Sequence, residues 1–199
     1  MSVPPRALFL APLAVGQTPL DPDEIGGLRL EINTRAELND AEEVAIREGI
    51  RWGERQIRHR DPLDLVFARE LHRRMFARVW TWAGTFRTTA RNIGVDAAQI
   101  NLCAQQLIDS ARYWIEHKTF PADEIFARFH HRLVQIHCFP NGNGRHARAM
   151  TDLVMAKLGA HRFGWGQSMP SERARAAYIF ALRAGDGGDF ASLLDFVRR

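Results

Sequence analysis

The residues of this chain best suited to chemistry gather in segment 137–148, which reads His-Cys-Phe-Pro-Asn-Gly-Asn-Gly-Arg-His-Ala-Arg. Gly142 and Gly144 permit backbone angles at which consecutive N–H groups converge on one point. At the start of a helix, such a nest of N–H groups is an anion-binding site. Arg145 and Arg148 lie three residues apart, so both project from one side of the helix that follows. The segment therefore predicts a site for a phosphate-bearing ligand.

His137 and Asn141 add two further functions to this segment. A histidine has an ordinary pKa of about 6.5, so His137 at the rim of the site is a candidate general base. The side-chain oxygen of Asn141 suits a hard cation such as Mg²⁺. Taken singly, the glycine run is an ordinary turn, and it fits neither the P-loop pattern nor the dinucleotide fingerprint. Together these residues favour phosphoryl-type transfer, which needs positioning and charge stabilisation.

The rest of the sequence predicts the elements that position this site. Apolar residues recur at three- and four-residue steps, which is typical of a mainly helical domain. Thr34 and Glu37 form a capping-box pattern, and prolines open two later helices. We expect a surface arm over residues 1–33 and a loop or small β-hairpin over residues 86–95. Helices are expected over residues 34–52, 67–80, 100–114, 121–136, 145–158, 170–185 and 190–197.

Composition and charge exclude several classes of protein. Of the 199 residues, 46% are hydrophobic and 25% are charged, which excludes disorder, collagen-like repeats and a disulfide scaffold. No stretch approaches the roughly 20 apolar residues of a membrane span, and prolines interrupt the apolar run near the N-terminus. Cys103 and Cys138 have no metal or redox spacing, so a reducing cytoplasm is the expected location. The net charge of +4, carried mainly by Arg, fits a phosphorylated partner or simply a solvated basic surface.

The segment 137–148 resembles the signature of the Fic/Doc (Fido) family, H-P-F-x-[DEN]-G-N-[GK]-R-x-x-R. It departs from the usual form at Cys138, where the family mostly has Pro, and at Asn141, where Asp or Glu is commoner. Residues 82–87 and 92–94 resemble the hairpin, or flap, of the family. With Arg-Ala-Glu-Leu-Asn at 35–39 and Tyr-Ile-Phe-Ala-Leu-Arg-Ala at 178–184, the whole chain resembles the subgroup called mobile mystery protein B.

This resemblance implies a mainly α fold, a Fic-type helical bundle with a small β-hairpin flap. Residues 1–64 would form an N-terminal arm and a helix packing on the core, and residues 65–199 the Fido domain. The implied activity is protein adenylylation, in which AMP moves from ATP to a Ser, Thr or Tyr hydroxyl of a target protein. His137 would take the proton from that hydroxyl as general base, the oxygen would attack the α-phosphate, and pyrophosphate would leave.

The resemblance also implies roles for the rest of the segment. Arg145 and Arg148 would neutralise the β- and γ-phosphates of ATP, and Asn143 would add its side-chain amide. Mg²⁺ would be held by the nucleotide and, more weakly than by an Asp, by Asn141. The backbone N–H groups expected to hold phosphate oxygens are those of Gly142, Asn143 and Gly144.

The flap is expected to present the target protein to His137 by adding a strand of the target to its edge. The residues expected to dock the target are Phe86, Arg87, Asn92, Ile93 and Gly94. Besides the target, a separate antitoxin or other inhibitory partner is an expected kind of partner, whereas a membrane is not.

Glu48 is a candidate inhibitory residue. Family members resemble one another in an inhibitory helix, [S/T]-x-x-x-E-[G/N], whose Glu pairs with the second arginine of the motif. Here Glu48 and the following glycine match its end, but Val44 replaces Ser or Thr. Glu48 shares a helix face with Trp52, where a carboxylate needs a partner, and Arg148 would be suitable. Alternatively Glu48 reaches solvent or an arginine of its own helix.

Other functions remain open on the sequence alone. A Doc-like kinase would transfer the γ-phosphate instead, although Gly144 stands where that variant has Lys. Transfer of another nucleotide or of phosphocholine uses a similar motif. A catalytically silent nucleotide- or nucleic-acid-binding module would fit the sequence pI of about 9.7, but no helix-turn-helix or stacked aromatic series supports it. A metal site among the four histidines at 130, 131, 137 and 146 is disfavoured, because adjacent helical residues diverge by about 100°.

Overall fold

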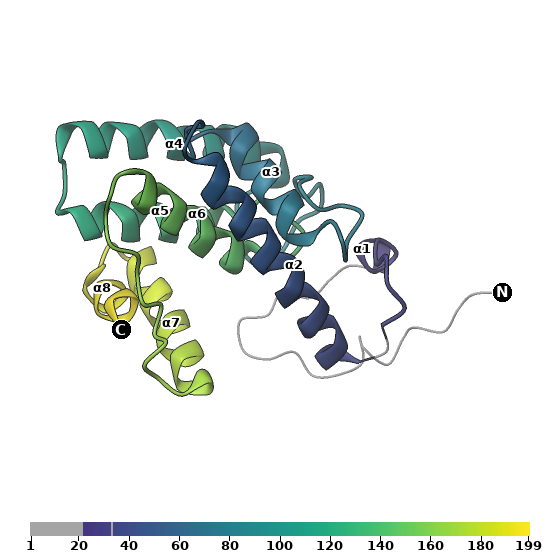
Figure 1. Cartoon of the computed structure of the whole chain (residues 1–199). Helices are drawn as coiled ribbons and strands as arrows, with labels where there is room; N and C mark the ends of the chain where they lie inside the picture. The colour runs from purple at the N-terminus through teal and green to yellow at the C-terminus, as the bar shows by residue number, and fades with distance from the viewer. Residues whose placement is uncertain (1–21, 33) are drawn as a thin grey trace.

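The described part of the chain, residues 22–32 and 34–199 of a computed structural model, is built from helices (Figure 1). Within these residues no strand forms, and a single antiparallel bridge joins Leu28 to Trp80. The mainly α fold expected from the sequence is confirmed, whereas most of the expected N-terminal arm lies outside the described residues. The helices are α1 (Pro22–Ile25), α2 (Arg35–Gln56), α3 (Leu65–Phe76), η2 (Ala97–Gln99), α4 (Ile100–His117), α5 (Ala122–Ile136), α6 (Asn143–Lys157), α7 (Ser171–Asp186) and α8 (Ala191–Arg198).

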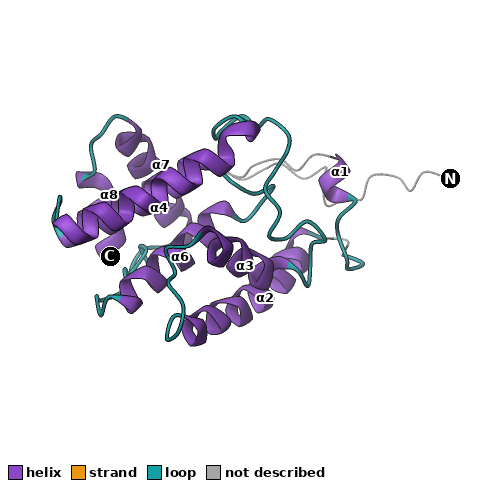
Figure 2. Ribbon diagram, turned by 90° about the horizontal axis from the view of Figure 1, so that it is seen from above, coloured by secondary structure: helices purple, strands orange, loops and turns teal. Residues whose placement is uncertain are grey.

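The helices share one hydrophobic core. Helices α2 and α3 lie side by side, as Figure 2 shows, and α5 packs against both α4 and α6. Helices α7 and α8 pack together at one end of the bundle (Figure 1). The domain boundary predicted at residue 64 stays a prediction. Helix α2, on the N-terminal side of that boundary, buries Leu38 and Ala45 in the same core as α3. Other core residues are Phe67, Leu71, Met75, Ile136, Met150 and Leu153.

Local signals in the sequence set the helix ends. The Thr34 Oγ1 accepts a hydrogen bond from the Glu37 N–H at 3.2 Å, and the Glu37 Oε2 accepts one from the Thr34 N–H at 3.1 Å. This is the capping box expected at the start of α2. Pro121 and Pro170 stand immediately before α5 and α7, where a missing N–H removes no helical hydrogen bond.

Of the two alternatives expected for residues 86–95, a loop or a small β-hairpin, the structure shows the loop, and no strand forms in this segment. The buried guanidinium of Arg87 takes the place of strand pairing. Its Nε donates to the His137 carbonyl oxygen at 2.7 Å, and its Nη groups donate to the carbonyl oxygens of Thr89 and Val95. The Arg87 N–H also donates to the Cys138 carbonyl oxygen at 3.0 Å. Arg87 therefore clamps the 86–95 loop to the segment that follows α5.

Among the described residues, none of the helices combines the length and the apolar character needed to cross a bilayer.

Candidate functional site

A cavity of about 1150 Å³ brings most of the predicted site residues together. It lies between the α5–α6 loop, the 86–95 loop, α7 and the first turns of α2. Among the predicted residues, Glu48, Phe86, Arg87 and Asn92 do not line it. The predicted residues that line it are Ile93, Gly94, His137, Asn141, Gly142, Asn143, Gly144, Arg145 and Arg148.

His137 ends α5 in a left-handed backbone conformation, with φ 55° and ψ 60°. This conformation turns the chain out of the helix and into the loop that leads to α6. The backbone of Gly94, where φ is 102°, packs closely against His137. A Cβ built on Gly94 would lie only 2.8 Å from the His137 Cβ. Gly94 is therefore required for the 86–95 loop to approach the histidine so closely.

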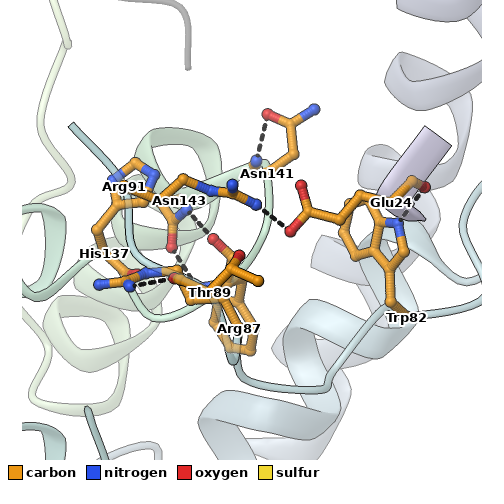
Figure 3. A network of polar contacts seen from close by, with 10 residues as sticks. Glu24, Trp82, Arg87, Thr89, Arg91, His137, Asn141 and Asn143 are labelled. Atoms are coloured by element: carbon orange, nitrogen blue, oxygen red, sulfur yellow. Dashed lines mark hydrogen bonds and ion pairs between the residues drawn. The ribbon is translucent and has the colours of Figure 1, made fainter. Parts of the chain in front are cut away.

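Positive charge and burial together set the protonation state of His137. Burial first, and then the charges of Arg87 and Arg91, lower the pKa of His137 from 6.5 to about 4. Figure 3 shows Arg87, Arg91 and His137 close together, with Arg91 paired to the Glu24 carboxylate. A histidine with this pKa is neutral at pH 7, which is the form that accepts a proton.

Side chains close the loop between α5 and α6. The Asn143 Nδ2 donates to the Phe139 carbonyl oxygen at 2.7 Å, and its Oδ1 accepts from the Phe139 N–H at 2.9 Å. Both polar atoms of the Asn143 amide therefore hold the loop, and its expected contact with phosphate through the second N–H stays a prediction. The Gly142 N–H donates to the Asn141 Oδ1 at 2.7 Å, so the N–H groups presented to a ligand begin after Gly142.

Helix α6 begins with its N–H groups at the cavity. Gly142 precedes it with φ 78°, and a Cβ at that position would lie 2.5 Å from the Phe76 ring. The N–H groups of Asn143, Gly144 and Arg145 stand in the first turn, where no helical carbonyl oxygen is available to them. With the helix dipole, they favour an anion in front of α6.

Arg148 reaches the cavity from the next turn of α6. Its guanidinium lies 4.5 Å from the Tyr178 ring centroid and 5.7 Å from that of Trp165. The Nε of Arg148 is buried without a hydrogen-bond partner, while Asp152 and Tyr178 interact electrostatically with the guanidinium. Because a buried guanidinium nitrogen left unsatisfied is expensive and Arg148 lines the cavity, an anion bound there would be favoured.

Arg145, by contrast, meets an acidic residue that the sequence analysis missed. The Glu42 Oε2 accepts from the Arg145 Nη1 at 2.7 Å, and the Glu42 Oε1 accepts from the Trp80 Nε1 at 2.7 Å. The periodicity contained the signal, since Glu42 lies four residues after Leu38 and three before Ala45, both of which are 1% exposed.

Glu48 lies elsewhere, and the expected pair with Arg148 is wrong. The Arg78 Nη1 donates to both Glu48 carboxylate oxygens at 2.6 and 2.7 Å, and the Glu48 side chain is about half exposed. Glu48 lines a separate groove between α2 and α3. It stands at the edge of the buried face of α2, whereas Glu42 is on that face.

His72 is a second residue that the sequence analysis missed. Its Nδ1 accepts from the Gly84 N–H at 3.0 Å, so its Nε2 carries the proton and donates to the Asn141 carbonyl oxygen at 3.1 Å. The His72 ring also stacks on Phe139 with centroids 3.7 Å apart. Burial lowers the pKa of His72 well below its ordinary value, which keeps the ring neutral. His72 therefore fixes the loop between α5 and α6 through its contacts with Asn141 and Phe139.

Cys138, next to the histidine, is buried at 3% exposure. Burial raises the pKa of its thiol to about 12, so the residue is a neutral packing group in place of the usual proline.

The described residues give little support to a protein-bound metal. They contain no group of three His, Cys, Asp or Glu side chains that could hold an ion. The oxygen of Asn141 is neutral and already accepts the Gly142 N–H. This donor set does not fit Mg²⁺ by itself, and no step below is routed through a metal.

The residues expected to dock a target divide into two groups. Phe86 packs against Phe139 with centroids 5.4 Å apart, and Arg87 is 3% exposed, so both are structural. Asn92, Ile93 and Gly94 are exposed. Of these, Ile93 and Gly94 line the mouth of the cavity.

The structure combines a helical bundle with a cavity at which the first turn of α6 and a neutral His137 meet. Residues 62–155 match the Fic/DOC family model, so the chain carries a Fic/DOC family domain. The narrower resemblance to the mobile mystery protein B subgroup stays a prediction.

Relatives and solved structures agree with this assignment. The chain is 29% identical over 134 residues to protein adenylyltransferase fic-1 of Caenorhabditis briggsae, covering 65% of this chain and 25% of the relative. The chain thus spans about a quarter of that relative's length. The structure of Fic-1 (residues 134–508) from C. elegans is similar with a TM-score of 0.63 at 25% identity, over 87% of this chain and 56% of that one. BepC of Bartonella tribocorum with bound AMPPNP gives 0.66 at 20% identity, over 86% and 89%.

Proposed function

We propose that this protein transfers AMP from ATP to a hydroxyl side chain of a target protein. The observation that carries the proposal is the cavity in which neutral His137, the first turn of α6 and the unsatisfied Nε of Arg148 meet. The relative named protein adenylyltransferase and the AMPPNP-bound BepC support a nucleotide as the ligand.

In the proposed reaction, His137 accepts the proton of a Ser, Thr or Tyr hydroxyl as its oxygen attacks the α-phosphorus of ATP. A phosphorus–oxygen bond to the target forms, the bond from the α-phosphorus to the β-bridging oxygen breaks, and pyrophosphate leaves. The N–H groups at the start of α6 and the guanidinium groups of Arg145 and Arg148 stabilise the charge on the phosphates. Fixed donors aimed at developing charge are the main source of catalysis in such transfers.

Labelled ATP separates this proposal from the alternatives. The protein is incubated with a cell lysate and ATP carrying ³²P at either the α- or the γ-phosphate. Label on protein from the α position supports adenylylation. Label from the γ position alone identifies a kinase and contradicts the proposal. Label from neither, together with measured ATP binding, identifies a binding module under these conditions.

Arg148→Ala is expected to weaken ATP binding, because its guanidinium makes a charge-assisted contact in a partly buried site. Losing that contact costs about 1.5–3 kcal/mol, or roughly 10- to 150-fold in affinity. Isothermal titration calorimetry measures the change. Arg47→Ala, which removes an exposed arginine of α2 paired with Glu43, is the matched control and should bind ATP like the wild type. Equal affinity in both variants would remove Arg148 from the site.

Ile93→Asp is expected to reduce modification of the target while leaving ATP affinity unchanged. Ile93 is 47% exposed at the mouth of the cavity, where we propose that the target chain docks beside the 86–95 loop. The same change at Val66, which is 67% exposed on α3, controls for an added surface charge. Unaltered target labelling by the Ile93 variant would show that the target docks elsewhere.

A further inference from the structure

Glu42 is a fully buried carboxylate at the back of the proposed phosphate site. It is 2% exposed, and both of its oxygens are used, one by the Trp80 indole and one by Arg145. Trp80 is itself 0% exposed. A buried carboxylate is tolerated only when it is paired and hydrogen-bonded, and these contacts meet that requirement. The carboxylate is thus anchored in the core and cannot move freely into the cavity.

Glu42 engages only part of the Arg145 guanidinium. Glu42 engages Nη1 alone, and the guanidinium lies 5.1 Å from the centroid of the Phe76 ring. The Arg145 side chain is still 39% exposed and lines the cavity. Its remaining N–H groups can therefore meet an anion in the cavity while the bond to Glu42 stays intact.

We propose that Glu42 is a positioning residue that holds Arg145 in the orientation in which it binds phosphate. This inference rests on the proposed function of the cavity. Glu42 lies in the wall of the cavity but is only 2% exposed, and both of its oxygens are already bonded, so it acts on transfer through Arg145. Fixing a charged donor before the substrate arrives removes the reorganisation that would otherwise accompany the reaction. A carboxylate that inhibited transfer by blocking the phosphate site would instead have to project into the cavity.

Glu42→Gln and Glu48→Gln form a matched pair of variants for the test, since both make the same change on the same helix. In Glu42→Gln the amide oxygen can still accept from Trp80, but the NH₂ group faces Arg145 and the ion pair is lost. We expect the kcat for transfer from α-labelled ATP to fall by about 10- to 100-fold in this variant. Glu48→Gln breaks an exposed pair outside the cavity and should behave like the wild type.

A double-mutant cycle with Arg145→Ala distinguishes positioning from a general structural role. If Glu42 acts through Arg145, then Glu42→Gln causes no further loss of kcat when Arg145 is already Ala. The same fold-loss in both backgrounds would overturn the proposal, and so would a rise in kcat in Glu42→Gln, which would make Glu42 a brake. Should Glu42→Gln fail to fold, Trp80→Phe removes the anchoring hydrogen bond instead. A smaller loss that vanishes in the Arg145→Ala background is then expected.

Calorimetric titration with ATP keeps the two proposals separable. If the wild type labels no protein from α-labelled ATP but binds ATP, the proposed transfer fails while the positioning role is still measured. Glu42→Gln should then lower ATP affinity several-fold in the presence of Arg145 and not in its absence. An unchanged ATP affinity in Glu42→Gln would overturn the positioning role under those conditions, and failure of the wild type to bind ATP would overturn both proposals.

Discussion

His137→Ala is expected to reduce AMP transfer by about 10²- to 10⁴-fold, the contribution typical of a general base. ATP affinity should stay within a few-fold of the wild type, because the phosphate contacts come from α6 and not from the histidine. Transfer is measured with α-labelled ATP and binding by calorimetry. His161→Ala, at an exposed histidine outside the cavity, is the control.

The backbone at His137 requires a second variant. Its φ of 55° is unfavourable for Ala, so a loss of activity could come from a displaced loop. Asn tolerates this conformation better, and His137→Asn should lose transfer to the same extent while preserving the fold. Transfer at the wild-type rate in either variant would exclude His137 as the base.

Acidification is expected to destabilise the fold strongly. Burial lowers the pKa of His130 to about 3 and those of His137 and His146 to about 4, and it lowers that of His72 well below its ordinary value. Between pH 6.5 and about 4 the unfolded chain therefore binds more protons than the native one, so the free energy of unfolding falls as the pH falls. Asp152, whose pKa burial raises to about 6, opposes this in part.

The net loss is expected to be several kcal/mol, since each unit of pKa shift corresponds to about 1.4 kcal/mol. Urea unfolding between pH 4.5 and 8 measures it. His146→Gln, which removes one of the titrating groups, should reduce the slope of unfolding free energy against pH. His161→Gln, at an exposed site, should not. A flat profile in the wild type would show that these histidines are not buried as neutral groups.

Much of the fold could be predicted because its signals are local. The capping box at Thr34 and the prolines at 121 and 170 act within one turn of chain, and the structure places helix starts there. The candidate anion site was equally local, since two glycines and two arginines specify it within a few residues. Because these residues are close together in the sequence, they line the same cavity.

The missed features depend on contacts between distant residues. Arg87 donates to carbonyl oxygens about 50 positions away, and main-chain acceptors leave no mark in the sequence. Glu48 and Glu42 lie less than two turns apart on one helix, and the partners that hold Glu42, Trp80 and Arg145, come from distant parts of the chain. His72 reads as one more residue of an amphipathic helix, although its ring supports Asn141.

The Arg87 clamp has a consequence for how this protein can change its partners. Its hydrogen bonds on the 86–95 loop are to main-chain oxygens, those of Thr89 and Val95. Most side chains between these two residues are exposed. Substitutions at the exposed positions Ala90, Asn92 and Ile93 can alter the surface of the loop without altering the hydrogen bonds that hold it to His137. Under the proposed function, new target preferences can then evolve, or be selected from a library, at these exposed loop positions, while the position of His137 is inherited unchanged.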